Sequence, residues 1–434
     1  MMNLAAQSGF RRISRRIVPM AFGIYIISYL DRVNISFAAP TMSKDLGFTP
    51  ETYGFVASIF FVSYALLEVP SNVIGRKFGT RLWLARIMLS WGVLVIFTAF
   101  VKEEWQFASV RVLLGAAEAG AFPLMVLYVT SWVPRASRAR ALGLFIASLA
   151  VAGVIGGPLS GVILSMDGFL GLAGWQWLFI IEALPALIVG VAVWARWPER
   201  PADVTWLNDE EKQAVVAQLA MENDDVAQRP LSIESLGKVM KSPWVWLLGV
   251  TGMFTLIGLY SITLWLPTFV KTDFSSLSEI QLGFVNGLPF AAAIIAMLIV
   301  GWSSDHFHER VWHLVIPLVV AGVAMYLTAS FGIMSGYTCL IIATMGIFAS
   351  DAVFWAMAPE FLVGAGAVAG FALINSIAAV GGIVGPYTVG ALVEHHGVAP
   401  ALIFVSGAMF VSAVLAFLVA RRITRQIRLG DLAS

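Results

Sequence analysis

Charged residues lie inside apolar stretches of this chain, at spacings that could support proton and anion chemistry. Asp31 and Arg32 are adjacent within residues 23–40, and Arg111 and Glu118 lie seven residues apart within a later stretch. A charge near the bilayer centre costs about 2.5–3.5 kcal/mol, so such groups need partners or a water-filled cavity. A guanidinium presents a planar fork of donors that matches a carboxylate. We therefore expect a cavity that takes up an anion together with a proton.

Helical spacing brings these polar residues onto shared faces. Arg111 and Glu118 are two turns apart, about 10 Å along a helix axis, and Gly115 between them leaves room for a neighbouring helix or water. In the first stretch, residues at spacings of three and four form one polar stripe, and Asp31 lies about 100° around from Arg32. The alternative is structural, with each arginine only locking two helices together. The stripe consists of Tyr25, Ser28, Tyr29, Arg32 and Ser36.

The elements that must position these groups are membrane-spanning helices. The 434-residue chain is 59% hydrophobic and 12% charged, with mean hydropathy +0.85, whereas about 25% charged residues is usual for a soluble domain. Apolar runs of about 20 residues recur from end to end, each long enough to cross a bilayer. We predict twelve spans, at residues 17–39, 53–75, 82–101, 106–130, 138–164, 175–197, 244–270, 280–302, 311–333, 336–360, 366–393 and 398–420.

The predicted fold is all-α, with two pseudo-symmetric six-helix halves. A polar, acidic segment at 198–243 separates residues 1–197 from residues 244–434. The sequence GGPLSG at 156–161 is echoed by VGPYTVG at 384–390, and a second pair of matching turns lies at nearly the same offset. Such repeats are typical of halves related by an axis along the membrane normal, with the binding site at midplane between them.

The distribution of lysine and arginine predicts the orientation. Outside the spans, Lys44, Lys102 and Lys271 fall on one side of the membrane, and all the other basic residues fall on the opposite side. This asymmetry places both termini and the central segment in the cytoplasm. The first span lacks a small-residue cleavage site, so we expect it to be retained. The single Cys339 excludes a disulfide framework.

The chain resembles the major facilitator superfamily, and within it the anion:cation symporter family of organic-acid transporters. The matching residues run through nearly the whole chain, in order. Two turns depart from the pattern, because Arg76 stands where an Asp is usual and His306 where Arg or Lys is usual. We therefore do not expect the first turn to provide the family's usual contact between a carboxylate and a helix dipole. The matches are SYLDRVNISFAAP, VPSNVIGRKFGTRLWLARIMLSWG, RVLLGAAEAGAFP, RARALG, FWAMAPEFL and LINSIAAVGGIVGPYTVG.

The resemblance implies roles for particular residues of this sequence. It places proton coupling on Asp31, Glu118 and Arg111. Asp351 matches no family role and is either a second titrating group or a contact specific to the substrate. The histidines His395 and His396 are adjacent and do not form a metal site. The predicted substrate-binding residues are Arg32, Tyr29, Tyr64, Trp355 and Asn375.

The resulting hypothesis is a proton-coupled importer of a small organic carboxylate, such as a sugar acid, a tartrate-like acid or an aromatic acid. Protonation of Asp31 and Glu118 would relieve their hold on the arginines, and Arg32 would then bind the substrate. Anion exchange and a non-transporting membrane sensor are the alternatives. No motif of an enzyme, metal site, cofactor site or nucleic-acid interface is present. We expect a monomer in the lipid bilayer of the bacterial inner membrane.

Overall fold

The computed structural model describes residues 4–223, 240–357 and 367–430, and in these ranges the chain is helical apart from its connections. Eleven helices in the described ranges are long and apolar enough to cross a membrane, and the apolar part of α6, Ser148–Leu164, adds a shorter one. The helices are α1 (Leu4–Leu46), α2 (Pro50–Phe78), α3 (Thr80–Thr98), α4 (Glu104–Glu118), α5 (Ala121–Trp132), α6 (Arg135–Leu164), α7 (Gly174–Arg196), α8 (Asp209–Asn223), α10 (Pro243–Asp273), α11 (Glu279–His306), α12 (Val311–Phe331), α13 (Tyr337–Met357), α14 (Ala367–His396) and α15 (Val398–Gly430).

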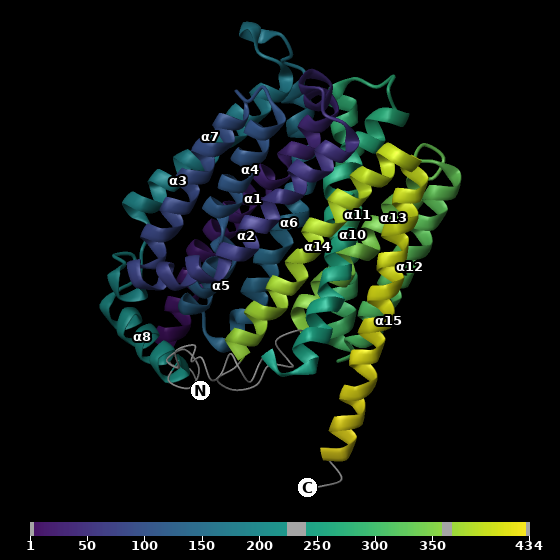
Figure 1. Ribbon diagram of the computed structural model, residues 1–434. Helices are drawn as coiled ribbons and strands as arrows, with labels where there is room; N and C mark the ends of the chain where they lie inside the picture. The colour runs from purple at the N-terminus through teal and green to yellow at the C-terminus, as the bar shows by residue number, and fades with distance from the viewer. Residues whose placement is uncertain (1–3, 224–239, 358–366, 431–434) are drawn as a thin grey trace.

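The helices form two groups that follow chain order. Figure 1 shows α1 to α7 on one side and α10 to α15 on the other, with the start of α1 and the end of α15 at the same end of the bundle and α8 close to the start of α1. The two groups meet where α2 packs on α14, α6 on α11 and α1 on α10. Chain ends on one side are consistent with the even number of spans predicted from the sequence.

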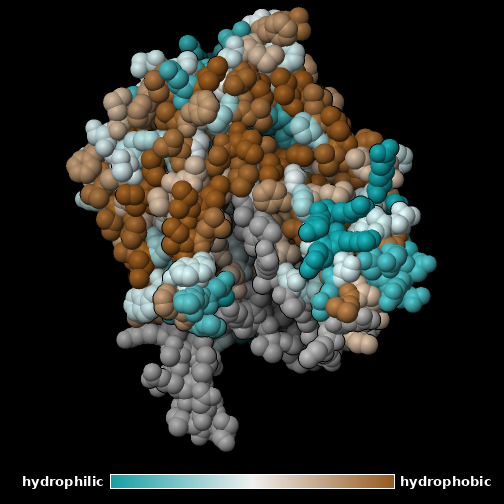
Figure 2. Space-filling model, turned by 180° about the vertical axis from the view of Figure 1, so that it is seen from behind, coloured by the Kyte–Doolittle hydropathy of each residue, from teal (hydrophilic) through white to brown (hydrophobic). Residues whose placement is uncertain are grey.

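The outer surface of the bundle is apolar along much of its length. Large side chains such as Leu66, Ile188 and Leu298 are exposed, and hydrophobic residues cover most of the face in Figure 2, with hydrophilic ones gathered toward the ends. A water-soluble protein rarely exposes so large an apolar surface. The chain is therefore a multi-pass membrane protein.

The fourth predicted span is broken into two helices. Helix α4 ends at Glu118, and α5 begins at Ala121. Between them Gly120 has φ +87°, in the left-handed region that only glycine adopts without strain. The prediction of one continuous helix over 106–130 was wrong at this point, because apolar periodicity does not report a single residue of positive φ.

The first helix is longer than the predicted span at 17–39, and its extension packs on α8. Arg12 donates to the backbone carbonyl of Trp206 at 3.2 Å and forms an ion pair with Glu211 at 3.3 Å. Ser8 Oγ donates to the same carboxylate at 2.6 Å. These polar contacts outside the apolar run explain why hydropathy alone underestimated the helix.

A carboxylate stands at the N-terminus of the helix that follows each of the two basic turns. Glu199, which follows α7, accepts hydrogen bonds from the amides of Thr80 and Arg81 at 2.7 and 3.0 Å. In the second half, Glu309 accepts from the amide of Trp312 at 2.9 Å. Negative charge at a helix N-terminus is stabilising. At the first turn, where residue 76 is Arg, the carboxylate comes from Glu199, which lies after α7.

Glycine allows the two helix groups to touch through their backbones at the end opposite the termini. A Cβ atom on Gly157 of α6 would lie 2.4 Å from the carbonyl oxygen of Gly283 on α11. The other crossing repeats this arrangement, since a Cβ on Gly54 of α2 would lie 2.7 Å from the carbonyl oxygen of Pro386 on α14. These short backbone contacts seal this end of the bundle without interposed side chains.

Candidate functional site

The centre of the bundle contains a buried ion pair between α1 and α4. Arg32 Nη2 donates to Glu118 Oε1, and the two residues are 7% and 4% exposed. Ser28 Oγ, one turn before the arginine, donates to the same carboxylate oxygen at 3.0 Å. Another nitrogen of the same guanidinium, Arg32 Nε, has no hydrogen-bond partner. Arg32 and Glu118 were each predicted as site residues, and the structure brings them together across two helices.

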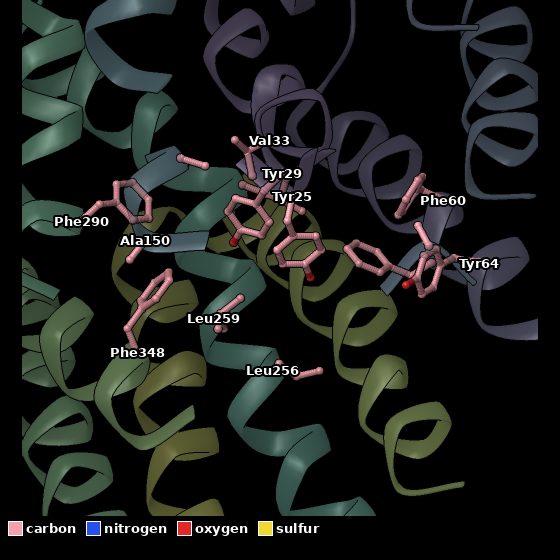
Figure 3. Packing of buried hydrophobic residues seen from close by; sticks show 14 of the residues in the cluster. Tyr25, Tyr29, Val33, Phe60, Tyr64, Ala150, Leu256, Leu259, Phe290 and Phe348 are labelled. Carbon is pink, nitrogen blue, oxygen red and sulfur yellow. The ribbon is translucent and has the colours of Figure 1, made fainter. Parts of the chain in front are cut away.

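Aromatic rings surround the guanidinium. The Cζ atom of Arg32 lies 5.0 Å from the ring centroid of Tyr64 and 5.5 Å from that of Phe60, both on α2. Figure 3 shows these two rings at one edge of the buried cluster, with Tyr25 and Tyr29 of α1 at its centre. Aromatic faces attract a cation and exclude water from it. The guanidinium therefore lies between a carboxylate and apolar rings.

The break after α4 sets the position of Glu118. The carboxylate is carried by the last helical residue, two positions before the left-handed Gly120. Discontinuous membrane helices expose their ends at the substrate sites of transporters. A Cβ on Gly120 would lie 2.7 Å from Ser71 Oγ, and that hydroxyl accepts from Trp83 Nε1 at 2.9 Å. The turn is therefore packed tightly against α2 and α3.

Arg111 contacts the backbone of α2. Its Nε donates to the carbonyl of Val56 at 3.2 Å, its Nη2 donates to that of Ala57 at 3.4 Å, and its Cζ lies 4.8 Å from the Phe60 ring centroid. Gly115 permits this approach, since a Cβ there would lie 2.2 Å from a carbonyl oxygen of α2. The structure places Arg111 on the predicted face of α4, but its direct polar contacts are with α2.

Asp31 faces away from the guanidinium, toward α3 and α7. Its Oδ2 accepts from Trp91 Nε1 at 2.7 Å, while its Oδ1 has no partner. Glu182 of α7 lies within electrostatic reach of Asp31 and accepts from Ser160 Oγ at 3.0 Å. The expectation that Asp31 also holds an arginine is not met in this conformation, because among the described residues Arg32 pairs with Glu118 and no arginine contacts Asp31.

Asn375 and Trp355 of the second half occupy different surroundings. Asn375 Nδ2 donates to Glu68 Oε1 of α2 at 2.7 Å, so it joins the two helix groups nearer the end of the termini. Trp355 packs edge-on against Phe354, with ring centroids 5.0 Å apart, and lies one helical turn after Asp351. Asn375 thus lies at the interface between the groups, whereas the contacts of Trp355 are with residues of the second group.

Tyr260 on α10 is a central residue that the sequence did not single out. Its ring lies 4.3 Å from that of Phe61, and its hydroxyl interacts with Arg32 and lies within electrostatic reach of Glu118 and Asp351. It therefore covers the ion pair from the second helix group. The available signal was the polar run at 260–263 in an otherwise apolar span. Trp91, by contrast, lay within one of the matching motifs.

Comparisons with known proteins agree with this architecture. A family model described as the Major Facilitator Superfamily matches residues 21–372. A candidate tartrate transporter of Agrobacterium vitis is 40% identical over 95% of this chain and 94% of its own. A quinolone resistance transporter of Acinetobacter baumannii is 36% identical, with 96% of each chain covered. The chain is accordingly a transporter and not an enzyme.

A solved structure shares the fold. The crystal structure of a bacterial homologue of the human lysosomal transporter Spinster, in an inward-facing and unoccupied conformation, aligns with a TM-score of 0.76. The alignment covers 94% of this chain and 97% of that one, at 17% sequence identity. Identity this low shows the arrangement of helices alone.

Proposed function

The chain belongs to the major facilitator superfamily, and from this premise we propose that it imports a small organic carboxylate by proton symport across the bacterial inner membrane. The observation that carries the proposal is the buried pair of Arg32 and Glu118. A guanidinium that already binds a carboxylate in an apolar interior can bind the carboxylate of a substrate in the same geometry.

The proton would act by exchanging one carboxylate for another. Protonation of Glu118 removes the charge that holds Arg32, and the substrate carboxylate then takes its place. Leaving Arg32 buried without any counter-ion would cost several kcal/mol, so the two events favour one another. Return of Glu118 to its ionised form on the cytoplasmic side would displace the substrate again.

Asp31 is proposed as a second group that gains and loses a proton. Its Oδ1 has no hydrogen-bond partner, and neither has Oε2 of the neighbouring Glu182. No cation contacts Asp31 among the described residues. Its partner Trp91 links it to α3, so a change in its charge would act on the packing of α1 against the rest of the first half. Arg111 supports the same half by fixing α2 on α4.

Alternating access is proposed to use the two six-helix halves, 1–197 and 244–434, with the segment 198–243 joining them in the cytoplasm. The close backbone contacts at Gly157 and Gly54 support a conformation closed on the outer side. The excess of lysine and arginine on the side of the termini supports their cytoplasmic location. Rocking of the halves about the central ion pair would then expose it to each side in turn.

The substrate class rests on the relatives and on the charge of the site. The Agrobacterium vitis relative bears a name that refers to tartrate, and Arg32 is suited to any carboxylate. Aromatic side chains such as Tyr64 and Trp355 would pack on an aromatic acid or on the carbon backbone of a sugar acid. We propose a small organic anion from one of these groups, bound by a monomer.

Uptake into proteoliposomes tests the proposal. An inward proton gradient is imposed across the vesicle membrane, and uptake of a panel of hydroxylated and aromatic carboxylates is measured with and without a protonophore. We expect at least one acid to accumulate, and Glu118→Gln to abolish accumulation because its side chain no longer takes part in proton transfer. Glu104→Gln, at an exposed position on the same helix, is the matched control and should transport normally. Accumulation by Glu118→Gln at the wild-type level would rule out coupling through this residue.

The same vesicles separate the alternatives. Strict anion exchange predicts flux only after the vesicles have been loaded with unlabelled acid, and no effect of the protonophore. A sensor predicts binding without flux under any of these conditions. Accumulation that collapses with the protonophore would exclude both.

A further inference from the structure

Three buried polar atoms without hydrogen-bond partners lie together between the two helix groups. They are the Tyr29 hydroxyl on α1, Thr263 Oγ1 on α10 and Asp351 Oδ1 on α13. The residues are 1%, 3% and 7% exposed. Helix α10, which carries Thr263, packs against both α1 and α13, and Tyr29 lies within electrostatic reach of Asp351 and close to Thr263. A buried polar group without a partner costs about 1–3 kcal/mol, so three in one place require an explanation.

The cluster adjoins the ion pair. Tyr29 lies within electrostatic reach of Arg32 as well as Asp351, and so does Tyr260. In Figure 3 the Tyr29 ring points away from the Tyr64 side of the cluster, toward Ala150 and Leu259. The central site therefore has a cationic end at Arg32 and an end lined by hydroxyl and carboxyl groups at Asp351.

We propose that Tyr29, Thr263 and Asp351 form a subsite that binds hydroxyl groups of the substrate, remote from the carboxylate on Arg32. This inference rests on the proposed function, since it assigns the second end of the same site. A hydroxyl both donates to the carboxylate of Asp351 and accepts from Tyr29 and Thr263, so it satisfies all three. The favoured ligand is thus a polyhydroxylated acid with one carboxylate.

The subsite also selects against two other classes of acid. An unsubstituted aliphatic or aromatic acid offers no donor, so the oxygen of Asp351 stays buried and unsatisfied. A second carboxylate on the ligand only accepts hydrogen bonds, and it would meet the like charge of Asp351. Sites built to bind a ligand hydroxyl discriminate strongly against analogues that lack it, because their own polar groups lose their partners.

Binding to the purified protein tests the subsite separately from transport. The probes are gluconate, hexanoate, which has the same number of carbons without hydroxyls, and glucarate, which has a second carboxylate. We expect the wild type to bind gluconate at least about 10-fold more tightly than either of the others. Asp351→Asn and Thr263→Val should each reduce this preference severalfold or more, chiefly by weakening the binding of gluconate. Ser350→Ala is the matched control, because Ser350 bonds only its own helix, at 2.8 Å to Ile347.

The outcomes separate the subsite from the transport mechanism. A preference for gluconate that is unchanged in both variants, or tighter binding of glucarate by the wild type, would overturn the subsite even if carboxylates are transported. Binding with the expected preferences, without proton-driven uptake, would overturn the symport proposal and leave the subsite standing. Absence of binding by all three acids would overturn both.

Discussion

Single carboxylates in this protein have different roles that depend on what faces them. Glu118 meets a guanidinium, Asp31 meets an indole N–H, and Asp351 has an oxygen with no partner. Glu309 is the simplest case, because backbone amides at a helix start surround it. The same functional group thus occurs as an ion-pair partner, as a hydrogen-bond acceptor, as a buried carboxyl group with an unpartnered oxygen, and as a helix cap.

The helix cap at Glu309 predicts a dependence of stability on pH. Partial burial acts to raise the pKa of this carboxyl, but hydrogen bonds from Trp312 and His313 outweigh it and lower the pKa below its ordinary value. A lowered folded-state pKa stabilises the protein above the ordinary value, about 4.3, and this contribution disappears as the pH falls through the folded-state pKa. Glu309→Gln should therefore lower Tm at pH 7 and have a progressively smaller effect below about pH 4.3.

Thermal unfolding of the purified protein, followed by tryptophan fluorescence from pH 7 to pH 3, measures this dependence. Glu104→Gln serves as the control, since its carboxylate is exposed and should give a small difference from the wild type at each pH. A Tm difference for Glu309→Gln that stays constant over the whole range would show that the charge of the cap contributes nothing.

At the scale of the element, the break between α4 and α5 determines where the site's carboxylate lies. Apolar runs predicted the spans from the sequence, because crossing a bilayer requires about 20 apolar residues, although the apolar part of α6 is shorter than the predicted 138–164. They could not predict the break, because one glycine of positive φ leaves the hydropathy unchanged. The extension of α1 onto α8 was missed for a related reason, since it is held by Arg12 and Ser8 rather than by apolar contacts.

Gly120→Ala tests the importance of the break. An alanine in the left-handed region costs about 1–2 kcal/mol, and its Cβ would displace the Ser71 hydroxyl from Trp83. We expect a lower Tm and an impaired uptake rate, because Glu118 shifts relative to Arg32. Gly23→Ala is the matched control, since nothing lies within 4 Å of its Cβ position. Normal uptake by Gly120→Ala would show that the site tolerates a continuous helix.

At the scale of the whole molecule, the sequence predicted the fold and singled out Arg32 and Glu118, but it did not predict that these two residues pair with each other. Arg32 and Glu118 were found because charges in apolar helices are rare and the motifs that hold them are distinctive. Tyr260 was missed because an aromatic residue in a membrane helix usually only packs. The neighbours of Asp351 could not be predicted, because they come from α1 and α10, which are far from α13 in the chain.

The backbone seal between the halves gives a prediction at this scale. Gly157→Val would place side-chain atoms against the Gly283 carbonyl and hold α6 and α11 apart, at a cost of about 1–3 kcal/mol. We expect slower uptake and a population opened on the outer side. In a background with Cys339→Ser, which removes the single cysteine, a cysteine introduced by Asn286→Cys should become accessible to an impermeant thiol reagent.

The controls for this measurement are Asn286→Cys alone, whose side-chain position is buried, and Asn286→Cys combined with Gly407→Val. Nothing lies within 4 Å of the Cβ position at Gly407, so that variant should leave the seal closed. Equal labelling of the Gly157→Val and Gly407→Val proteins would show that the glycine contact does not hold the outer side shut.

The seal and the centre of this protein use different parts of the chain's chemistry. The seal is made by backbone atoms at Gly157, Gly283 and Gly54, whereas the centre is made by side chains such as Arg32 and Asp351. Substitutions that alter which cargo is accepted therefore need not alter how the halves close. In evolutionary terms, substrate specificity can change through a few substitutions at the centre, while the glycine contacts between the halves are retained.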